Sequence, residues 1–222
     1  MSAVAVALTG ALAVALAPRV WLEALVPALA YALAVLVCTL AGTDAELPTQ
    51  RARNGVSRAR VARSVAALLL TGVPANVLYA CAAHRALALE TLRPLRVVLG
   101  CALLDTLEYW LHRAYHTKLL YARLHKQHHE LKLPYSYGAL YNGAEVALTA
   151  PALFLAFYAG GLAYREMLAV TALSYVCTVR QHTYAGARER AHHWLHHAES
   201  QQHNYAQPFT DVWDRLANTK RW

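Results

Sequence analysis

Residues 20–41 read VWLEALVPALAYALAVLVCTLA and carry one charged side chain, Glu23. A helix of this length can cross the roughly 30 Å hydrocarbon core of a bilayer. The whole chain has the same bias, because 57% of its 222 residues are hydrophobic and 15% are charged, whereas an ordinary soluble domain is about one quarter charged. We therefore predict an all-α integral membrane helical bundle.

Further apolar segments lie on both sides of this stretch. We predict that Val65–Ala83 and Val97–Leu111 are crossings. Val146–Ala163 and Met167–Val179 form a hairpin that either spans the membrane or re-enters it. Ser2–Ala17 is an interfacial helix or a short span. The prediction is thus about four transmembrane helices plus a possible extra N-terminal one.

Positive charge sets the predicted orientation. Five arginines lie in the polar segment 43–63, and the positive-inside rule places such a cluster in the cytoplasm: Arg51, Arg53, Arg58, Arg60 and Arg63. Two crossings return the chain to that side, and the hairpin keeps it there. Both histidine-rich parts of the chain then face the cytosol. Because this bias accounts for the net charge of +8, we expect no nucleic-acid partner.

Histidine is the second compositional anomaly, with 12 histidines against 13 acidic residues. His112 and His116 are four residues apart, so on a helix they share a face. The pattern His-x-x-His-His then occurs twice, at 125–129 and at 193–197, and His182 lies alone between the two. We interpret His84 and His203 as isolated core histidines. Without a bound ion, the clustered rings would be either buried unpaired polar groups or cations that repel one another.

A metal site is the better interpretation of the clustered rings. One ion takes about four to six ligands, so eight or nine imidazoles imply two ions. Zinc has no redox chemistry and its structural sites need only four ligands. The rings lie just beyond the ends of the predicted spans, whereas a metal transporter would place them within the spans. The pattern favours iron and the oxidation of a lipid-soluble substrate.

Three motifs resemble the histidine boxes of the membrane fatty acid hydroxylase and sterol desaturase superfamily. They are YWLHRAYH (109–116), LHKQHH (124–129) and HWLHH (193–197). Three further stretches are most similar to sphinganine C4-hydroxylases: LPYSYGALYN (133–142), TVRQH (178–182) and NYAQPFTDVWDRL (204–216). The chain departs from the family after Asn142, where Gly143-Ala144-Glu145 lacks the usual histidine.

The resemblance implies an oxygen-dependent lipid hydroxylase with a non-haem di-iron centre and dioxygen as co-substrate. Zinc is a possible substitute in purified protein. Residues 1–95 would form the transmembrane region and 96–222 the catalytic domain, with the histidine boxes on a cytosolic cap. The implied substrate is sphinganine or dihydroceramide, and the location is the endoplasmic reticulum membrane. The alternatives are a C5 sterol desaturase-like enzyme, another lipid desaturase or hydroxylase, and a catalytically degenerate zinc-binding membrane protein.

Electrons must come from outside, because the sequence holds no Gly-x-Gly-x-x-Gly fingerprint. The resemblance suggests cytochrome b5 and its reductase. An acidic donor would suit the basic residues near the boxes: Arg113, Lys118, Arg123, Lys126 and Lys132. The alternative is that these residues only set the topology and contact lipid phosphates.

The resemblance also assigns roles to individual residues. The expected metal ligands are His112, His116, His125, His128, His129, His182, His193, His196 and His197, with His192 as a possible extra ligand. Asp105 and Asp214 either accept a ring N–H or serve as helix caps or surface ion pairs. Glu145, Asn142 and Asn204 are weaker candidates for that role. The substrate channel would be lined by aromatic residues that could otherwise be membrane anchors: Tyr135, Tyr137, Tyr141 and Phe209.

Overall fold

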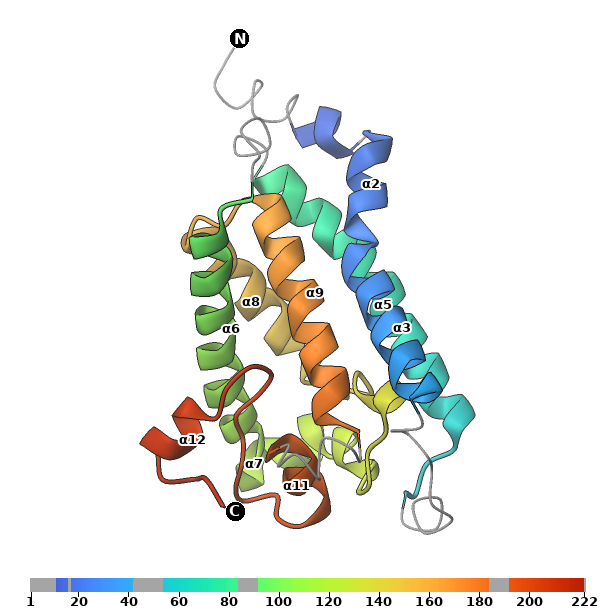
Figure 1. Ribbon diagram of the computed structural model, residues 1–222, viewed down its shortest axis with the longest axis vertical. Helices are drawn as coiled ribbons and strands as arrows, with labels where there is room; N and C mark the ends of the chain where they lie inside the picture. The colour runs from blue at the N-terminus through green and yellow to red at the C-terminus, as the bar shows by residue number, and fades with distance from the viewer. Residues whose placement is uncertain (1–10, 16, 42–53, 84–91, 184–191, 222) are drawn as a thin grey trace.

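The computed structural model describes residues 11–15, 17–41, 54–83, 92–183 and 192–221. All regular secondary structure in these ranges is helical, which confirms the predicted class. The long helices run along the long axis of the molecule (Figure 1). Three short helices gather at one end: α7 (Lys118–Leu120), α11 (His192–Ala198) and α12 (Val212–Leu216).

Two helical segments are long and apolar enough to cross a membrane. The first is formed by α2 (Pro18–Ala24) and α3 (Val26–Leu40), and the second is α5 (Arg58–Ala82). Both agree with predicted spans. The number of crossings beyond these two stays a prediction.

The chain enters α5 earlier than the hydropathy pattern indicates. Ser57 caps the helix, and its side chain accepts a hydrogen bond from the backbone N–H of Arg60. The last arginines of the polar segment therefore lie in the first turns of α5. Arg51 and Arg53 lie outside the described residues, as does most of the predicted N-terminal segment, residues 1–10 and 16.

Helix α6 (Pro94–Tyr115) begins with proline at its first position, where the missing N–H costs no hydrogen bond. It extends four residues beyond the predicted end at Leu111, and so it carries His112 into the site. The prediction followed apolar residues only, whereas the polar residues at this end of α6 are part of the same helix.

The predicted hairpin is formed by α8 (Val146–Ala159) and α9 (Tyr164–Gln181). Gly161 turns the chain between them with a φ of 69°, a conformation that glycine adopts without strain. Glu166 then accepts a hydrogen bond from the backbone N–H of Ala163 at the start of α9. With 14 residues, α8 is shorter than the roughly 20 needed for a full crossing.

Helix α9 is central to the bundle, because it packs against both α3 and α6. Helix α2 packs on α5, and α6 packs on α8. Leucines on the outer faces of these helices are largely exposed, among them Leu33, Leu70, Leu99 and Leu155. Such a broad apolar exterior fits contact with lipid rather than with water.

The second histidine box is not the regular helix that its spacing predicted. After α7 (Lys118–Leu120) the chain makes a π-helical turn, η2 (Tyr121–His125), and a 3-10 turn, η3 (His128–Glu130). A second 3-10 turn, η4 (Ser136–Gly138), packs against α3, α5 and α9. The third box is helical, as α11 (His192–Ala198), and α12 (Val212–Leu216) follows.

Candidate metal centre

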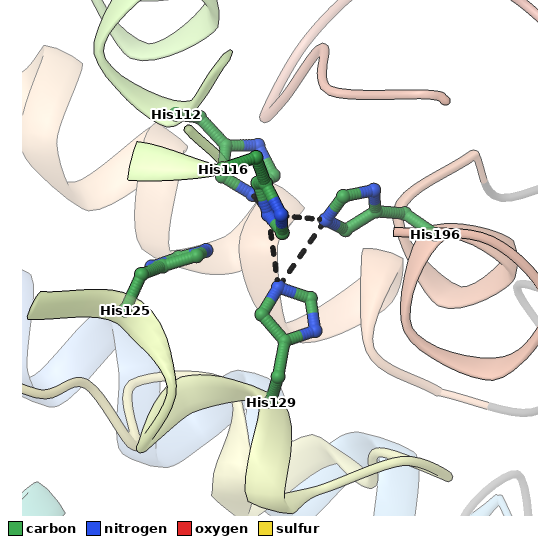
Figure 2. Close-up of side chains that lie close together, drawn as sticks. All are labelled: His112, His116, His125, His129 and His196. Atoms are coloured by element: carbon green, nitrogen blue, oxygen red, sulfur yellow. Dashed lines mark hydrogen bonds between the residues drawn. The ribbon is translucent and has the colours of Figure 1, made fainter. Parts of the chain in front are cut away.

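The nine histidines expected as ligands lie together at one end of the bundle. They come from the end of α6, the turns between 121 and 130, the end of α9, and α11. All are nearly inaccessible to solvent, since the most exposed, His116, is 9% exposed. Figure 2 shows five of these rings turned toward a common centre.

The ligand nitrogens form two groups, and within each group all of them lie within 4.8 Å of one another. The five-histidine cluster contains His112, His116, His125, His129 and His196. The four-histidine cluster contains His128, His182, His193 and His197. Sequence neighbours such as His128 and His129 therefore enter different clusters, which places the two clusters next to each other.

Backbone carbonyl groups orient five of the rings. In each case Nδ1 lies 2.7–3.1 Å from a backbone carbonyl oxygen. The ring and the residue that supplies the carbonyl are, in order, His112 and Tyr205, His128 and Tyr141, His182 and Thr178, His196 and His203, and His197 and Leu131. A carbonyl oxygen only accepts, so Nδ1 carries the proton and Nε2 keeps its lone pair. This is the tautomer that a metal ligand bound through Nε2 requires.

The Nε2 atoms face one another at short range. The Nε2 atoms of His128 and His197, both fixed as bare acceptors, are 3.0 Å apart. In the five-histidine cluster, His196 Nε2 lies 2.9 Å from that of His116. Two nitrogen lone pairs that face each other repel, whereas a cation between them is coordinated by both. Metal–nitrogen bonds of about 2.0–2.1 Å put neighbouring ligand nitrogens roughly 3.0–3.4 Å apart. Both clusters therefore fit a transition-metal ion.

Burial keeps the rings uncharged. It lowers the pKa of His128 from 6.5 to about 4 and, together with neighbouring rings, that of His182 to about 3. Burial, followed by the surrounding rings, holds the pKa of His129 and of His193 well below the usual range. At neutral pH the imidazoles are thus in the form that binds metal.

Asp214 differs from the expectation that it would accept a ring N–H. It is fully buried, and it accepts backbone N–H groups of Tyr205 at 3.0 Å and Ala206 at 2.8 Å. Since the Tyr205 carbonyl accepts from His112, Asp214 supports this ring through the backbone. The carbonyl of Tyr205 contacts His112 directly, and the Asp214 carboxylate holds the loop that carries Tyr205.

Asp105 and Asn204 fasten the same C-terminal segment. Asp105 accepts from the backbone N–H of Phe209 at 3.0 Å and also from Thr210, and so it joins α6 to this segment rather than binding a ring. Asn204 adopts a left-handed conformation with a φ of 59°, and its Oδ1 accepts from the backbone N–H of Arg221 at 2.8 Å. The partners that the structure gives Asp105 and Asn204 are thus backbone N–H groups and, for Asp105, Thr210, in place of a ring N–H.

Glu145 is the predicted carboxylate that faces a ligand ring. Its Oε1 lies 3.4 Å from Nδ1 of His125, and 4% of the residue is exposed. Burial raises the pKa of Glu145. The turn before it needs glycine, because a Cβ at Gly143 would collide with the backbone carbonyl of Leu124. The departure from the family pattern at this position therefore has a local structural reason.

A cavity of about 410 Å³ ends at the histidines. Helices α5, α6, α8 and α9 supply its mainly apolar walls. His112 and His125 reach it from the five-histidine cluster, and His128 reaches it from the other. Along α9 the lining runs from Thr178 to Met167, about 16 Å at 1.5 Å per residue. The cavity is an elongated apolar space with metal-ligand groups at one end.

The aromatic residues predicted to line a channel lie elsewhere. None of the four is among the lining residues of this cavity. The rings of Tyr135 and Tyr137 pack together with centroids 4.2 Å apart, and Tyr141 donates a hydrogen bond to Glu130 at 2.6 Å. Phe209 packs against the core formed by α2, α5, α6, α8 and α9. The structure therefore does not bring these four residues to this cavity, whose walls come from the long helices, and their role in substrate passage stays a prediction.

Sequence reasoning missed several lining residues. Glu108 and Gln207 line the cavity beside the histidines. Glu108 precedes His112 by four residues and therefore shares its face of α6; this spacing was a usable signal. Among the remaining histidines, His203 donates to or accepts from Ser200 Oγ at 2.9 Å and lies outside both clusters.

The side chains of two further histidines lie outside the described residues. His84 lies outside the described residues, and so does the side chain of His192, whose backbone begins α11.

Known proteins are similar to the part of the chain that holds the two clusters. A family model described as fatty acid hydroxylase matches residues 97–219, which hold both clusters. Sphinganine C4-monooxygenase 1 of Arabidopsis thaliana is 31% identical over 179 residues, 74% of this chain and 68% of the relative. Sphingolipid C4-hydroxylase SUR2 of Saccharomyces cerevisiae is 32% identical over 139 residues, 56% of this chain and 40% of the relative.

A more distant oxygenase is also similar. Methylsterol monooxygenase 1 of Rattus norvegicus is 31% identical over 137 residues, 54% of this chain and 45% of the relative. No solved structure matches the chain.

Proposed function

The chain belongs to the fatty acid hydroxylase family and is an oxygen-dependent lipid hydroxylase, and on this premise we propose that it hydroxylates C4 of a sphingoid base. The substrate would be sphinganine or dihydroceramide, and the product phytosphingosine or phytoceramide. The observation that carries the proposal is the elongated apolar cavity that ends at both histidine clusters. A single saturated chain fits such a space.

We propose that each cluster holds one iron ion, with the Nε2 atoms as ligands. Two iron ions, with dioxygen, two electrons and two protons, would convert an unactivated C–H bond into C–OH, and the second oxygen atom would leave as water. Zinc prefers the same imidazole ligands and has no redox chemistry, so it would give inactive protein. The backbone carbonyl groups hold the rings in place before any ion arrives.

Placement of the substrate is the main task of the protein. A saturated acyl carbon offers no group for acid or base catalysis, so selectivity depends on which carbon is held against the ligand rings. The walls of α5, α8 and α9 would keep the chain extended and exclude water.

Membrane placement and electron supply complete the proposal. The histidine end would face the cytosol from the endoplasmic reticulum membrane, and residues 96–222 would form the catalytic domain. Cytochrome b5 and its reductase would supply electrons. The basic residues from Arg113 to Lys132 suit an acidic donor, because opposite charge accelerates encounter.

Lipid analysis tests the proposal. The full chain and its His128→Ala variant are expressed in cells that lack 4-hydroxylated long-chain bases, and the lipids are measured by mass spectrometry. We expect phytosphingosine or phytoceramide with the unchanged chain only. His203→Ala is the matched control and should stay active, because its ring lies outside both clusters and the substitution keeps the backbone carbonyl that accepts from His196. A new sterol oxidation product or a new double bond, without a 4-hydroxylated base, would refute the assignment.

A further inference from the structure

The cavity that ends at the histidines is closed at both ends and open on one side. Buried side chains form the end far from the histidines: Tyr79, Leu104, Phe157 and Met167. The lining residues at the histidine end are buried or half-buried, and these include Asn142 and Gln207. Among the described lining residues, three are exposed: Thr71, Ala75 and Ala150. We call these three residues the lateral mouth.

The lateral mouth lies between two helices on the apolar exterior of the bundle. Thr71 and Ala75 are near the middle of α5, which is long and apolar enough to cross a membrane, and Ala150 is in the second turn of α8. Helix α5 packs mainly on α2 and helix α8 on α6, so α5 and α8 share the cavity without being each other's main partner. Exposed leucines surround the opening on the same two helices: Leu70, Leu78, Leu148 and Leu155. The opening therefore faces the hydrocarbon of a bilayer that α5 crosses.

The side chains of the mouth suit the passage of an alkyl chain. Two of the three are alanines, and the hydroxyl group of Thr71 donates to the backbone carbonyls of Ala67 and Leu68 in its own helix, both at 3.0 Å. Gly72 lines the cavity beside them, and a Cβ at this position would meet no atom within 4 Å. Glycine inside a helix lowers the stability of the helix, and here it leaves space at the wall. The mouth is thus small-sided and without a free hydroxyl donor.

We propose that the lateral mouth admits the alkyl chain of the lipid substrate directly from the bilayer, sideways between α5 and α8. This rests on the proposed function, because it supplies the route by which the lipid reaches the clusters. A lipid that takes this route never exposes its chain to water, which would cost free energy for every CH2 group. The buried far end of the cavity then stops the tail, and the polar end of the lipid lies toward the histidines.

An exchange experiment on the metal-loaded full chain in lipid nanodiscs, without reductant, tests the mouth independently of turnover. The probes are sphinganine and hexadecanol, each with a trifluoromethyl group at the end of the chain, and fluorine NMR measures the bound fraction and the rates of entry and release. The variants Ala75→Trp and Ala150→Trp fill the mouth. The matched controls are Ala66→Trp and Ala147→Trp, because these alanines are exposed on the same two helices but do not line the cavity.

We expect Ala75→Trp and Ala150→Trp to slow both entry and release about tenfold while the bound fraction changes little, because a bulky group at the mouth raises the barrier in both directions. The control variants should exchange like the unchanged protein. Metal content per chain, measured on the same samples, should be equal in all of them. Where a tryptophan variant loses metal, the smaller Ala75→Leu and Ala150→Leu variants decide, and each should slow exchange by a lesser factor.

Three results would overturn the inference. One is unchanged exchange in the mouth variants, which would mean that the chain enters elsewhere. Another is a lower bound fraction with unchanged rates of entry, which would mean that the new side chain occupies the binding space and not the route. The last is no bound signal from either probe in the unchanged protein. The proposed function is judged separately from the 4-hydroxylated product: product with unchanged exchange rejects the mouth alone, and slowed exchange of hexadecanol without product rejects the reaction alone.

Discussion

Asp214→Asn tests whether the C-terminal segment sets the position of a metal ligand. The carboxylate accepts three hydrogen bonds, from the backbone N–H groups of Tyr205 and Ala206 and from Thr219 Oγ1 at 2.7 Å. Tyr205 in turn accepts from His112 Nδ1 at 2.7 Å. An asparagine has nearly the same shape, so the substitution changes hydrogen bonding and charge with little change in packing.

The expected cost follows from these bonds. The asparagine oxygen can still accept two of them, but its NH2 group faces a buried N–H and leaves that donor unpaired, which costs about 1–3 kcal/mol. Loss of the charge weakens the remaining bonds, and the total is about 2–4 kcal/mol. For a chain of this size that is a fall in Tm of about 5–15 °C. Because the Tyr205 carbonyl shifts, metal affinity at the five-histidine cluster should also fall, by about 10–100-fold.

Thermal unfolding and metal analysis of purified protein measure both effects. Asp211→Asn is the matched control, since Asp211 directly precedes the same short helix and pairs with Arg215 and Lys220, and such peripheral pairs contribute about 0–1 kcal/mol each. Unchanged metal affinity in Asp214→Asn, with a normal Tm, would refute the reasoning. Loss of the ion from the four-histidine cluster alone would also contradict it.

Three further predictions concern the ions, pH and the cavity. His182→Ala should lower the metal content from two ions per chain toward one, because it leaves three ligands in its cluster. His116→Ala leaves four ligands in the other cluster and should retain more metal. Elemental analysis of the purified variants measures the difference, and equal losses would contradict the two-cluster arrangement. Burial lowers the pKa of His128 to about 4 and that of His182 to about 3, so the metal-free protein should lose stability as the pH falls below about 6.5, where the unfolded chain binds protons that the folded chain does not. Its Tm should change little between pH 7 and 8, and a Tm that rises on acidification would refute this sign. Thr171→Phe, halfway along the cavity, should shift the preferred substrate toward shorter chains in a competition assay, and an unchanged preference would show that the chain lies elsewhere.

Hydropathy was sufficient for the presence of the long helices but not for all of their ends. The apolar stretches at residues 20–41 and 65–83 correspond to helical segments in the structure. Helix α6 was predicted too short, because its last turns carry polar side chains that face the site. A helix that is apolar toward lipid and polar toward a metal centre has no uniform hydropathy, so its length cannot be read from apolar residues alone.

The spacing of the histidines predicted which rings would meet, but not what holds them. Helical i, i+4 spacing accounts for His112 with His116 and for His193 with His197, whose Nε2 atoms lie 3.2 and 3.1 Å apart. The acceptors of the ring N–H groups could not be predicted, because they are backbone carbonyls of loops, such as Leu131 opposite His197. Every residue has a carbonyl, so no side-chain pattern marks these positions.

Metal binding and the folding of this end of the molecule should therefore be coupled. The lone pairs of rings such as His128 and His197 face each other at 3.0 Å, and burial keeps these rings unprotonated, so a bound cation would stabilise an arrangement that the neutral rings alone disfavour. An ion converts these repulsive contacts into bonds, so much of its binding free energy becomes folding free energy. The ligand rings come from segments as far apart as α6 and α11, and the C-terminal segment fastens them through Asp105 and Asp214. The buried core around Tyr79 and Phe157 is apolar, and we expect it to fold without a bound ion.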